Sequence, residues 1–394
     1  MQIVSGEQSS NSAHEDFKPR NDGIDLVRGF SILAVVLFHF RLQMRFFGHP
    51  IVPLMPHMPA SLTYLIFSNG NNAVTVFFAV SGFLITSTSL RRFGSLGEIS
   101  VSKFYKFRFA RIAPLLLLVL AVLSLLHLLK VPRFAIEPNV ASLPEAIAAA
   151  LSFTLNYFEA ARGYLPAGWD VMWSLSIEEV FYLFFPILCV AIGLMPARRT
   201  LFLLAAILLI LLGPFARTHW TSNEIWMEKS YLGNMDAIAM GCLTAVLLKS
   251  AAGSTTYRVR KARIAFLLKL AGVAFIVLIA IWPHWGWLRS LGRLGLDITI
   301  LPFGTCLFIA GAVLSDVPGG HFGLPIRWLG RHSYEVYLTH EFVVIVCAWL
   351  YTEILAGPII LWISAVVLCS CAVGAAVTYS FSEPLNGYLR RKLV

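Results

Sequence analysis

Long apolar runs recur along the whole chain, and they constrain its fold more than any other feature of the sequence. Runs of roughly 18 to 25 residues are long enough to cross a bilayer as α-helices. We place about ten such runs, at residues 24–46, 72–90, 109–130, 171–195, 200–216, 233–249, 264–282, 294–315, 333–351 and 358–381. The composition agrees, since 58% of the residues are hydrophobic, 13% are charged and the mean hydropathy is +0.74. The sequence therefore predicts an all-α polytopic membrane protein and excludes a soluble core.

The basic residues are distributed unevenly between the two sides of this predicted bundle. Most of the 31 Lys and Arg residues fall on the side that the N-terminus shares, and this bias sets membrane orientation. We therefore expect both termini in the cytoplasm, and we interpret the net charge of +10 as a signal of topology and of membrane lipid contact, with no nucleic-acid partner. We expect a disordered cytoplasmic tail at residues 1–23, the transmembrane domain at 24–385 and a basic cytoplasmic tail at 386–394.

The first apolar run carries two ionisable residues, Arg28 and His39, within the segment DLVRGFSILAVVLFHF. They are eleven positions apart, close to three helical turns, so both side chains project from one face of a helix. The helical rise separates them by roughly 16 Å, which puts His39 near the membrane midplane if Arg28 lies at one surface. Ionisable groups at that depth usually have a function. The alternative is an arginine that anchors the helix end and a histidine that hydrogen-bonds to a neighbouring helix.

Two further motifs lie in the second and third runs. Ser81 and Gly82, in FFAVSGFLIT, would let another helix or a ligand approach closely, because small residues mark tight contacts in membranes. Arg108 and Arg111, in FYKFRFARIAP, are three positions apart and form one cationic face on a helix. Paired guanidinium groups suit phosphate because they offer planar, bidentate donors. Lipid headgroup binding combined with a topology signal explains the same pair.

Adjacent glutamates, Glu178 and Glu179, open the fourth run in WSLSIEEVFYLFFP. Neighbouring helical positions point about 100° apart, so we expect only one of the two carboxylates to face a given site. Glutamate in the outer turn of a span is costly without a role. The apolar part of the preceding segment, Leu143 to Tyr157, is expected to form an interfacial or re-entrant helix.

The last motif is RWLGRHSYEVYLTHEF, in which Tyr334, Tyr337 and His340 recur every three residues and share a helix face. His340 is a second buried histidine, at a depth close to that of His39. We predict no metal site, because the six cysteines form no CxxC pair and the outer-loop histidines have no carboxylate neighbours.

Taken in order, these motifs resemble the membrane-bound acyltransferase-3 family. The resemblance rests on Arg28 and His39, FFAVSGFLI, Arg108 with Arg111, WSLSIEEVFY and SYEVYLTH, and it extends over nearly the whole chain from Asp25 onward. It implies an integral protein of the bacterial inner membrane that transfers an acyl group, usually acetyl from acetyl-CoA, to a hydroxyl group. The implied acceptors are glycans or lipid-linked glycans, such as O-antigen or exopolysaccharide.

The resemblance also implies roles for the residues. His39 would be the general base or a transient acyl carrier, and Glu178 or Glu179 would orient the acceptor or the imidazole. Arg28, Arg108 and Arg111 would hold the phosphates of acyl-CoA, without a metal. The remaining candidates would line the acceptor site: Ser81, Trp173, Ser174, Tyr334, Tyr337 and His340.

Two other classes of protein are compatible with buried Arg, His and Glu. A secondary transporter uses such groups as a proton relay, but it is usually built from inverted repeats, and the sequence shows no convincing internal symmetry. A non-catalytic membrane partner of a polysaccharide exporter is the other class, and it would have no need of the arginine pair beside a midplane histidine.

Overall fold

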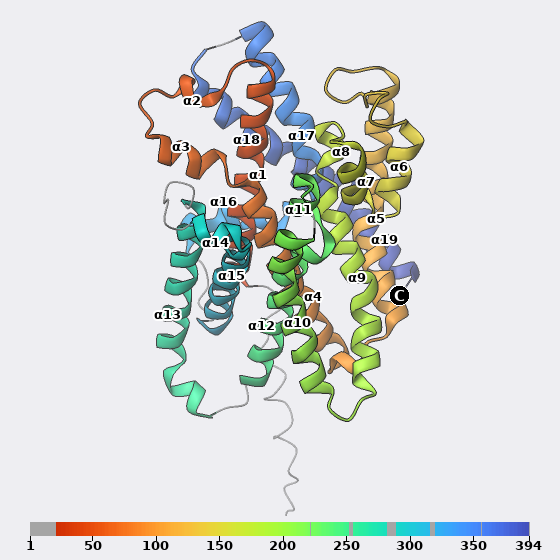
Figure 1. The fold of residues 1–394 in the computed structure, drawn as a ribbon, viewed down its shortest axis with the longest axis vertical. Helices are drawn as coiled ribbons and strands as arrows, with labels where there is room; N and C mark the ends of the chain where they lie inside the picture. The colour runs from red at the N-terminus through yellow and green to blue at the C-terminus, as the bar shows by residue number, and fades with distance from the viewer. Residues whose placement is uncertain are drawn as a thin grey trace, which may run out of the picture.

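The computed structural model describes residues 21–220, 222–251, 255–281, 289–315, 320–355 and 357–393. Within these ranges the chain is a bundle of helices without a β-strand (Figure 1). The long helices are α1 (Asp22–Phe46), α4 (Gly70–Phe93), α5 (Val101–Leu128), α9 (Trp173–Gly193), α10 (Arg198–His219), α12 (Tyr231–Ala251), α13 (Thr255–Ala280), α15 (Leu296–Ser315), α17 (Ser333–Leu350), α18 (Ile359–Val377) and α19 (Glu383–Leu393). The short ones are α2 (Ile51–Leu54), α3 (Ala60–Phe67), α6 (Leu143–Leu151), α7 (Leu155–Arg162), α8 (Ala167–Asp170), α11 (Glu224–Lys229), α14 (Arg289–Arg293) and α16 (Leu324–Arg331).

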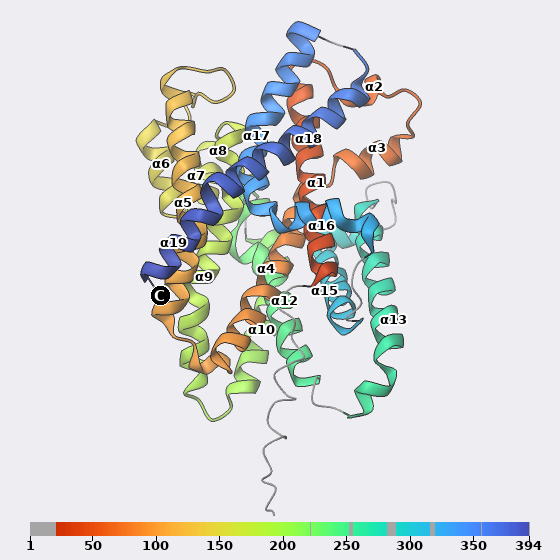
Figure 2. The same ribbon diagram turned by 180° about the vertical axis from the view of Figure 1, so that it is seen from behind.

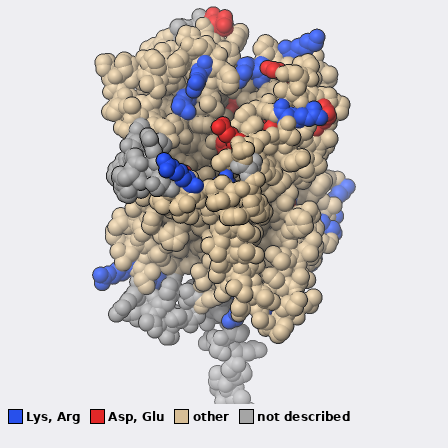
Figure 3. Space-filling model, viewed as in Figure 1, with Lys and Arg blue, Asp and Glu red and all other residues tan. Residues whose placement is uncertain are grey.

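Nine helical segments among the described residues are long and apolar enough to cross a membrane, and they match nine of the predicted runs. The predicted run at 333–351 forms α17, which is helical but is not one of the nine. Its apolar surface is interrupted by Glu335, His340 and Glu341, which are 1%, 0% and 1% exposed. All ten predicted runs therefore form helices, and α17 is largely buried inside the bundle. Residues other than Lys, Arg, Asp and Glu make up most of the surface seen in Figure 3, as a lipid-facing protein requires.

Helix α1 stands inside the bundle and contacts α4, α16, α17 and α18. It begins where the Asn21 side chain accepts hydrogen bonds from the backbone N–H groups of the first turn. Figure 2 shows α16 running across α1. This crossing is close because Gly29 of α1 and Gly330 of α16 each face the backbone of the other helix, where a Cβ atom would clash. The close crossing brings the start of α17 beside Arg28.

Gly82 in α4 allows the close helix contact that the sequence predicted. A Cβ atom there would collide with the backbone carbonyl of Ile238 in α12, and Gly241 of α12 meets α4 in the same way. The two helices therefore pack with their backbones close together. This contact fixes the position of Ser81, the neighbouring candidate residue.

An ion pair between Arg217 and Asp236 links α10 to α12 inside the bundle. Arg217 Nη2 lies 2.8 Å from Asp236 Oδ2, and the two side chains are 3% and 0% exposed. The same guanidinium donates to the Thr299 hydroxyl at 2.6 Å and to the Gly295 carbonyl at 2.9 Å, which ties in α15. Neither residue was recognised from the sequence as half of this pair.

Two predicted segments take other forms. Leu143 to Tyr157, expected to be an interfacial or re-entrant helix, forms α6 and the first part of α7 with a break between them. Residues 386–393, expected to be a basic tail, belong to helix α19, which packs against α5. Most of the predicted N-terminal tail, residues 1–20, lies outside the described residues.

We predict that Asp236→Asn destabilises the protein by about 3 kcal/mol, because it leaves the Arg217 charge buried without a counter-charge. Thermal unfolding in detergent would measure the loss. Arg162→Gln is the control, since its pair with Glu145 is 54% and 45% exposed and contributes at most about 1 kcal/mol. Equal melting temperatures for Asp236→Asn and the native protein would contradict a structural role for the pair.

Candidate active site

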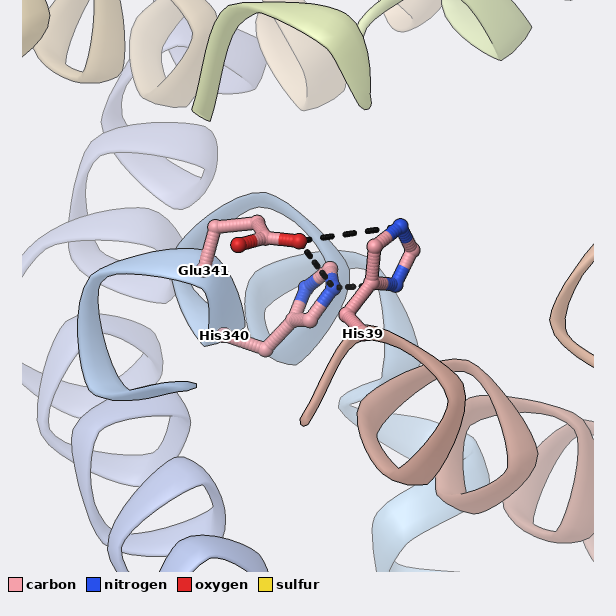
Figure 4. A group of neighbouring side chains, drawn as sticks. All are labelled: His39, His340 and Glu341. Carbon is pink, nitrogen blue, oxygen red and sulfur yellow. Dashed lines mark hydrogen bonds and ion pairs between the residues drawn. The ribbon is translucent and has the colours of Figure 1, made fainter. Parts of the chain in front are cut away.

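Two imidazoles and a carboxylate meet where α1 passes α17 (Figure 4). His39 comes from α1, and His340 and Glu341 come from α17. His340 Nε2 lies 3.1 Å from His39 Nδ1, and Glu341 Oε1 lies 3.6 Å from His39 Nε2. Both α17 residues are fully buried, whereas the His39 side chain keeps 14% of its surface exposed. His39 is therefore the member of the group that a substrate can reach.

The hydrogen bonds define where His39 carries its proton. His340 Nδ1 lies 2.6 Å from the Tyr337 carbonyl and must donate to it, so His340 Nε2 has the lone pair and accepts. His39 Nδ1 lies 3.1 Å from His340 Nε2 and 2.9 Å from the Val35 carbonyl oxygen. Both neighbours are acceptors, so in neutral His39 the proton is on Nδ1. The lone pair is then on Nε2, the atom available to act as a base.

A chain of polar side chains holds Glu341. Gln43 Nε2 donates to Glu341 Oε2 at 3.4 Å, and Arg133 donates twice to Gln43 Oε1, at 3.0 and 3.2 Å. Glu341 Oε1 is buried and has no hydrogen-bond partner. Because this oxygen faces His39 Nε2, it can stabilise the imidazolium that forms when His39 takes up a proton. Sequence reasoning missed all three residues, although Gln43 lies one turn after His39 and Glu341 adjoins His340.

Among the described residues, His39, His340 and Glu341 form the group whose spacing could accommodate a metal ion. One donor atom from each of His39, His340 and Glu341 lies within 4.8 Å of the others. However, His39 Nδ1 and His340 Nε2 already hydrogen-bond to each other at 3.1 Å. This direct contact favours proton transfer through the group.

A cavity of about 690 Å³ opens on one side of His39. We call it the histidine pocket, and its walls combine aromatic rings with polar and charged groups: Phe38, His39, Gln43, Phe46, Asn71, Arg133, Glu137, Tyr164, Asp170, Trp173, Glu228, Lys229 and Tyr337. Aromatic walls with converging polar groups are typical of small-molecule sites. The predicted residue Trp173 lines this pocket, whereas its neighbour Ser174 lines the other cavity.

A cluster of charged side chains, Lys229, Glu159 and Asp170, contributes Lys229 and Asp170 to the wall of this pocket. Lys229 Nζ lies 2.9 Å from Glu159 Oε2 and also contacts Asp170. Burial and the neighbouring Asp170 carboxylate raise the pKa of Glu159 well above its usual range, against the opposing effect of Lys229. The cluster joins α7, α8 and α11 and holds two charged side chains at the pocket wall.

A second cavity, of about 170 Å³, contains most of the other predicted residues. We call it the arginine pocket, and its polar lining is Arg28, Ser81, Arg108, Arg111, Ser174, Glu178, Tyr182, Ser333, Tyr334 and Tyr337. The structure thus brings residues from α1, α4, α5, α9 and α17 to one place. Their separation in the sequence gave no indication of this convergence.

The three arginines of the pocket have different partners. Arg28 donates to the Ser333 hydroxyl at 2.9 Å. Arg111 forms an ion pair with the buried Glu335, at 2.9 Å. Arg108 has no ion pair within 4.0 Å among the described residues, and its guanidinium lies over the Tyr182 ring, 3.9 Å from the centroid. Arg108 is therefore the arginine most available to an anionic ligand.

The two adjacent glutamates diverge, as their helical spacing predicts. Glu178 lines the arginine pocket and accepts a hydrogen bond from Tyr182 at 2.8 Å, while Tyr182 also contacts the Ser81 hydroxyl. Glu179 does not line either cavity, and its Oε1 is buried without a hydrogen-bond partner. The expectation that Glu178 or Glu179 orients the imidazole needs correction, because Glu341 is the carboxylate beside His39.

Tyr337 and Val74 line both cavities and form the wall between them. The Tyr337 hydroxyl is held by Ser174, at 2.8 Å, and by the Val171 carbonyl, at 2.9 Å. Tyr334 is fixed in the arginine pocket by a hydrogen bond to the Ile112 carbonyl at 2.9 Å. A cationic cavity and a mixed polar and aromatic cavity therefore meet at Tyr337 and Val74, and His39 lines the second of them.

These features define a class of protein: a polytopic helical membrane protein with an acid–base group at the edge of one of two adjoining internal cavities. A family model described as an acyltransferase domain, Acyl_transf_3, matches residues 21–380. The chain therefore belongs to the acyltransferase-3 family. No solved structure matches the chain.

Curated relatives from Staphylococcus aureus are similar over the same region. O-acetyltransferase OatA of strain NCTC 8325 / PS 47 is 24% identical over 380 residues, which cover 92% of this chain and 56% of the relative. Putative O-acetyltransferase SACOL0978 of strain COL is 23% identical over 386 residues, with the same shares covered. The chain thus spans little more than half the length of these relatives.

We predict that Glu341→Gln lowers the turnover number about 100-fold, because it removes the charge beside His39 while it keeps the side chain's shape. Its melting temperature should not fall. Glu353→Gln, at an exposed position just beyond α17, is the matched control. Steady-state kinetics would decide the point, and an unchanged turnover number for Glu341→Gln would exclude this role.

Proposed function

We propose that this protein is an integral membrane O-acyltransferase. It moves an acyl group, acetyl in the simplest case, from cytoplasmic acyl-CoA to a hydroxyl group of a surface or exported glycan. The proposed location is the bacterial inner membrane. Family membership supports acyl transfer, and the names of the relatives support oxygen as the acceptor atom and acetyl as the group.

The observation that carries this proposal is the position of His39 Nε2. Its lone pair is free, it lies 3.6 Å from Glu341, and its ring lines the histidine pocket, which shares Val74 and Tyr337 with the arginine pocket. A group-transfer enzyme needs a base at the place where two substrates meet. His39 meets that requirement if one substrate enters through each cavity.

The chemistry follows from this arrangement. The acceptor hydroxyl gives its proton to His39 Nε2, and its oxygen attacks the thioester carbonyl carbon. The carbon–sulfur bond then breaks, and the CoA thiolate leaves and takes the proton, so the products are an O-acyl ester and free CoA. Glu341 stabilises the imidazolium in between, and the Nδ1 hydrogen bonds to Val35 and His340 keep the ring oriented.

The donor belongs in the arginine pocket. Guanidinium groups bind phosphate in planar, bidentate fashion, and Arg108 is available because Arg111 is engaged by Glu335. A cavity of about 170 Å³ is too small for all of CoA but suits its pantetheine arm. The thioester has to pass Tyr337 and Val74 to reach His39.

The acceptor belongs in the histidine pocket. Trp173, Tyr164 and Phe38 offer ring faces, and Asp170, Lys229 and Arg133 offer hydrogen bonds. Such a lining suits a sugar, which has apolar C–H faces and many hydroxyls. The cavity of about 690 Å³ is four times the volume of the arginine pocket and has room for a glycan unit.

We predict that His39→Asn abolishes transfer, with a loss of at least about 1,000-fold. The asparagine amide can still donate to the Val35 carbonyl, so the fold should survive. The assay is release of free CoA from acetyl-CoA by inside-out membrane vesicles that contain lipid-linked glycans. His57→Asn, on an exposed outer segment, is the control. Native CoA release by His39→Asn would refute the base assignment.

A further prediction concerns the donor. Arg108→Gln should raise the Michaelis constant for acetyl-CoA about tenfold and leave the turnover number nearly unchanged, as expected for loss of one phosphate contact. Arg111→Gln should also lower the melting temperature, because the buried Glu335 loses its partner. An effect of Arg108→Gln confined to the acceptor would contradict this assignment.

A further inference from the structure

Two arginines from separate helices lie near the Phe107 ring of α5, and a third arginine, Arg108, adjoins Phe107 in the sequence. Arg92, at the end of α4, has its guanidinium carbon 4.0 Å from the Phe107 ring centroid, and Arg390 of α19 lies 5.5 Å from the same centroid. Arg108 follows Phe107 in α5, and its charge acts on both Arg92 and Arg390. Figure 2 shows α19 lying across α5, which brings Arg390 to this position.

No member of the cluster is paired with a carboxylate at ion-pair distance among the described residues. In the part of the chain that the structure describes, none of Arg92, Arg108 and Arg390 forms an ion pair within 4.0 Å, whereas Arg111 and Arg217 each have a carboxylate. Arg390 Nε is buried and lacks a hydrogen-bond partner. Like charges held together repel one another, and a bound anion removes that cost. The arrangement therefore points to an anionic ligand.

The cluster is continuous with the arginine pocket, because Arg108 belongs to both. Glu178, which lines the arginine pocket, and Glu179 both act on the Arg108 charge, and so do Arg92 and Arg390, which lie near Phe107. A ligand that extends out of the arginine pocket past Arg108 could therefore place an anionic group beside Arg92 and Arg390. Planar guanidinium groups from three helices suit a phosphate monoester, which has three oxygens to offer.

We propose that Arg92, Arg108 and Arg390 form a subsite for the terminal phosphate monoester of the acyl donor, the 3′-phosphate of CoA. This inference rests on the proposed function. It gives α19 a part in donor recognition and adds Arg92 and Arg390 to the residues identified from the sequence. The phosphate of a lipid headgroup has the same chemistry, and the experiment below separates the two sources.

The test compares CoA with dephospho-CoA, which lacks only the 3′-phosphate. Binding of each to the purified full-length protein in nanodiscs would be measured by titration calorimetry. The native protein should bind CoA about tenfold more tightly than dephospho-CoA, which corresponds to about 1.4 kcal/mol. Arg92→Gln and Arg390→Gln should bind CoA nearly as weakly as dephospho-CoA, with no change for dephospho-CoA. Arg391→Gln, at the exposed next position of α19, should keep the native preference.

The other outcomes each overturn one proposal. If the native protein binds neither compound, the CoA-dependent function fails. If it prefers CoA and both variants keep that preference, the 3′-phosphate is bound elsewhere and the subsite is refuted. The titration is repeated in nanodiscs with and without phosphatidylglycerol to test for a lipid site. If the lipid changes CoA binding by the native protein but not by the variants, and the variants bind CoA with native affinity, the arginines bind a lipid phosphate and the subsite is refuted. Ligand-free melting temperatures confirm folding, and Arg390→Lys provides a variant that keeps the charge if Arg390→Gln unfolds.

Discussion

The burial of Glu335, His340 and Glu341 on a single interior helix is the constraint on which the rest of the structure depends. Each of these side chains is at most 1% exposed, and a bilayer protein cannot leave such groups without partners. Arg111 of α5 meets Glu335, and His39 of α1 meets both His340 and Glu341. The positions of α1 and α5 around α17 are therefore fixed by charge and hydrogen bonding as well as by apolar packing. Because α17 is shielded by its neighbours, it can carry polar groups that a lipid-facing helix could not.

Helix α1 connects the two cavities through its own periodicity. Arg28 borders the arginine pocket and His39 borders the histidine pocket. The helical rise places them roughly 16 Å apart on one face, a distance that a pantetheine arm can span. One rigid helix therefore sets the separation between the cationic groups and the base. The proposed reaction needs such a fixed separation, since a thioester is productive only when it is held at attacking distance from the acceptor.

Much of the fold could be predicted from the sequence because apolar runs report helices directly. The spacing of Arg28 and His39, and that of Tyr334, Tyr337 and His340, also indicated which residues share a face. Contacts between distant segments left no local signal: His39 and His340 are 301 positions apart, and Gln43 and Glu341 are 298 apart. For that reason Glu341, Arg133 and the Lys229–Glu159–Asp170 cluster were missed, and Glu178 or Glu179 was expected to orient the acceptor or the imidazole, whereas Glu341 is the carboxylate beside His39. The charge of the end of the chain suggested a basic tail and gave no sign that this segment forms helix α19, which packs against α5.

The central claim is that the donor and acceptor reach His39 from opposite cavities. A structure of the protein bound to a non-hydrolysable acetyl-CoA analogue tests this most directly. The proposed function predicts that the analogue's phosphates lie near Arg108, that its arm occupies the arginine pocket, and that its carbonyl mimic passes Tyr337 toward His39 Nε2. An analogue bound in the histidine pocket, among Arg133 and Lys229, would contradict the proposal.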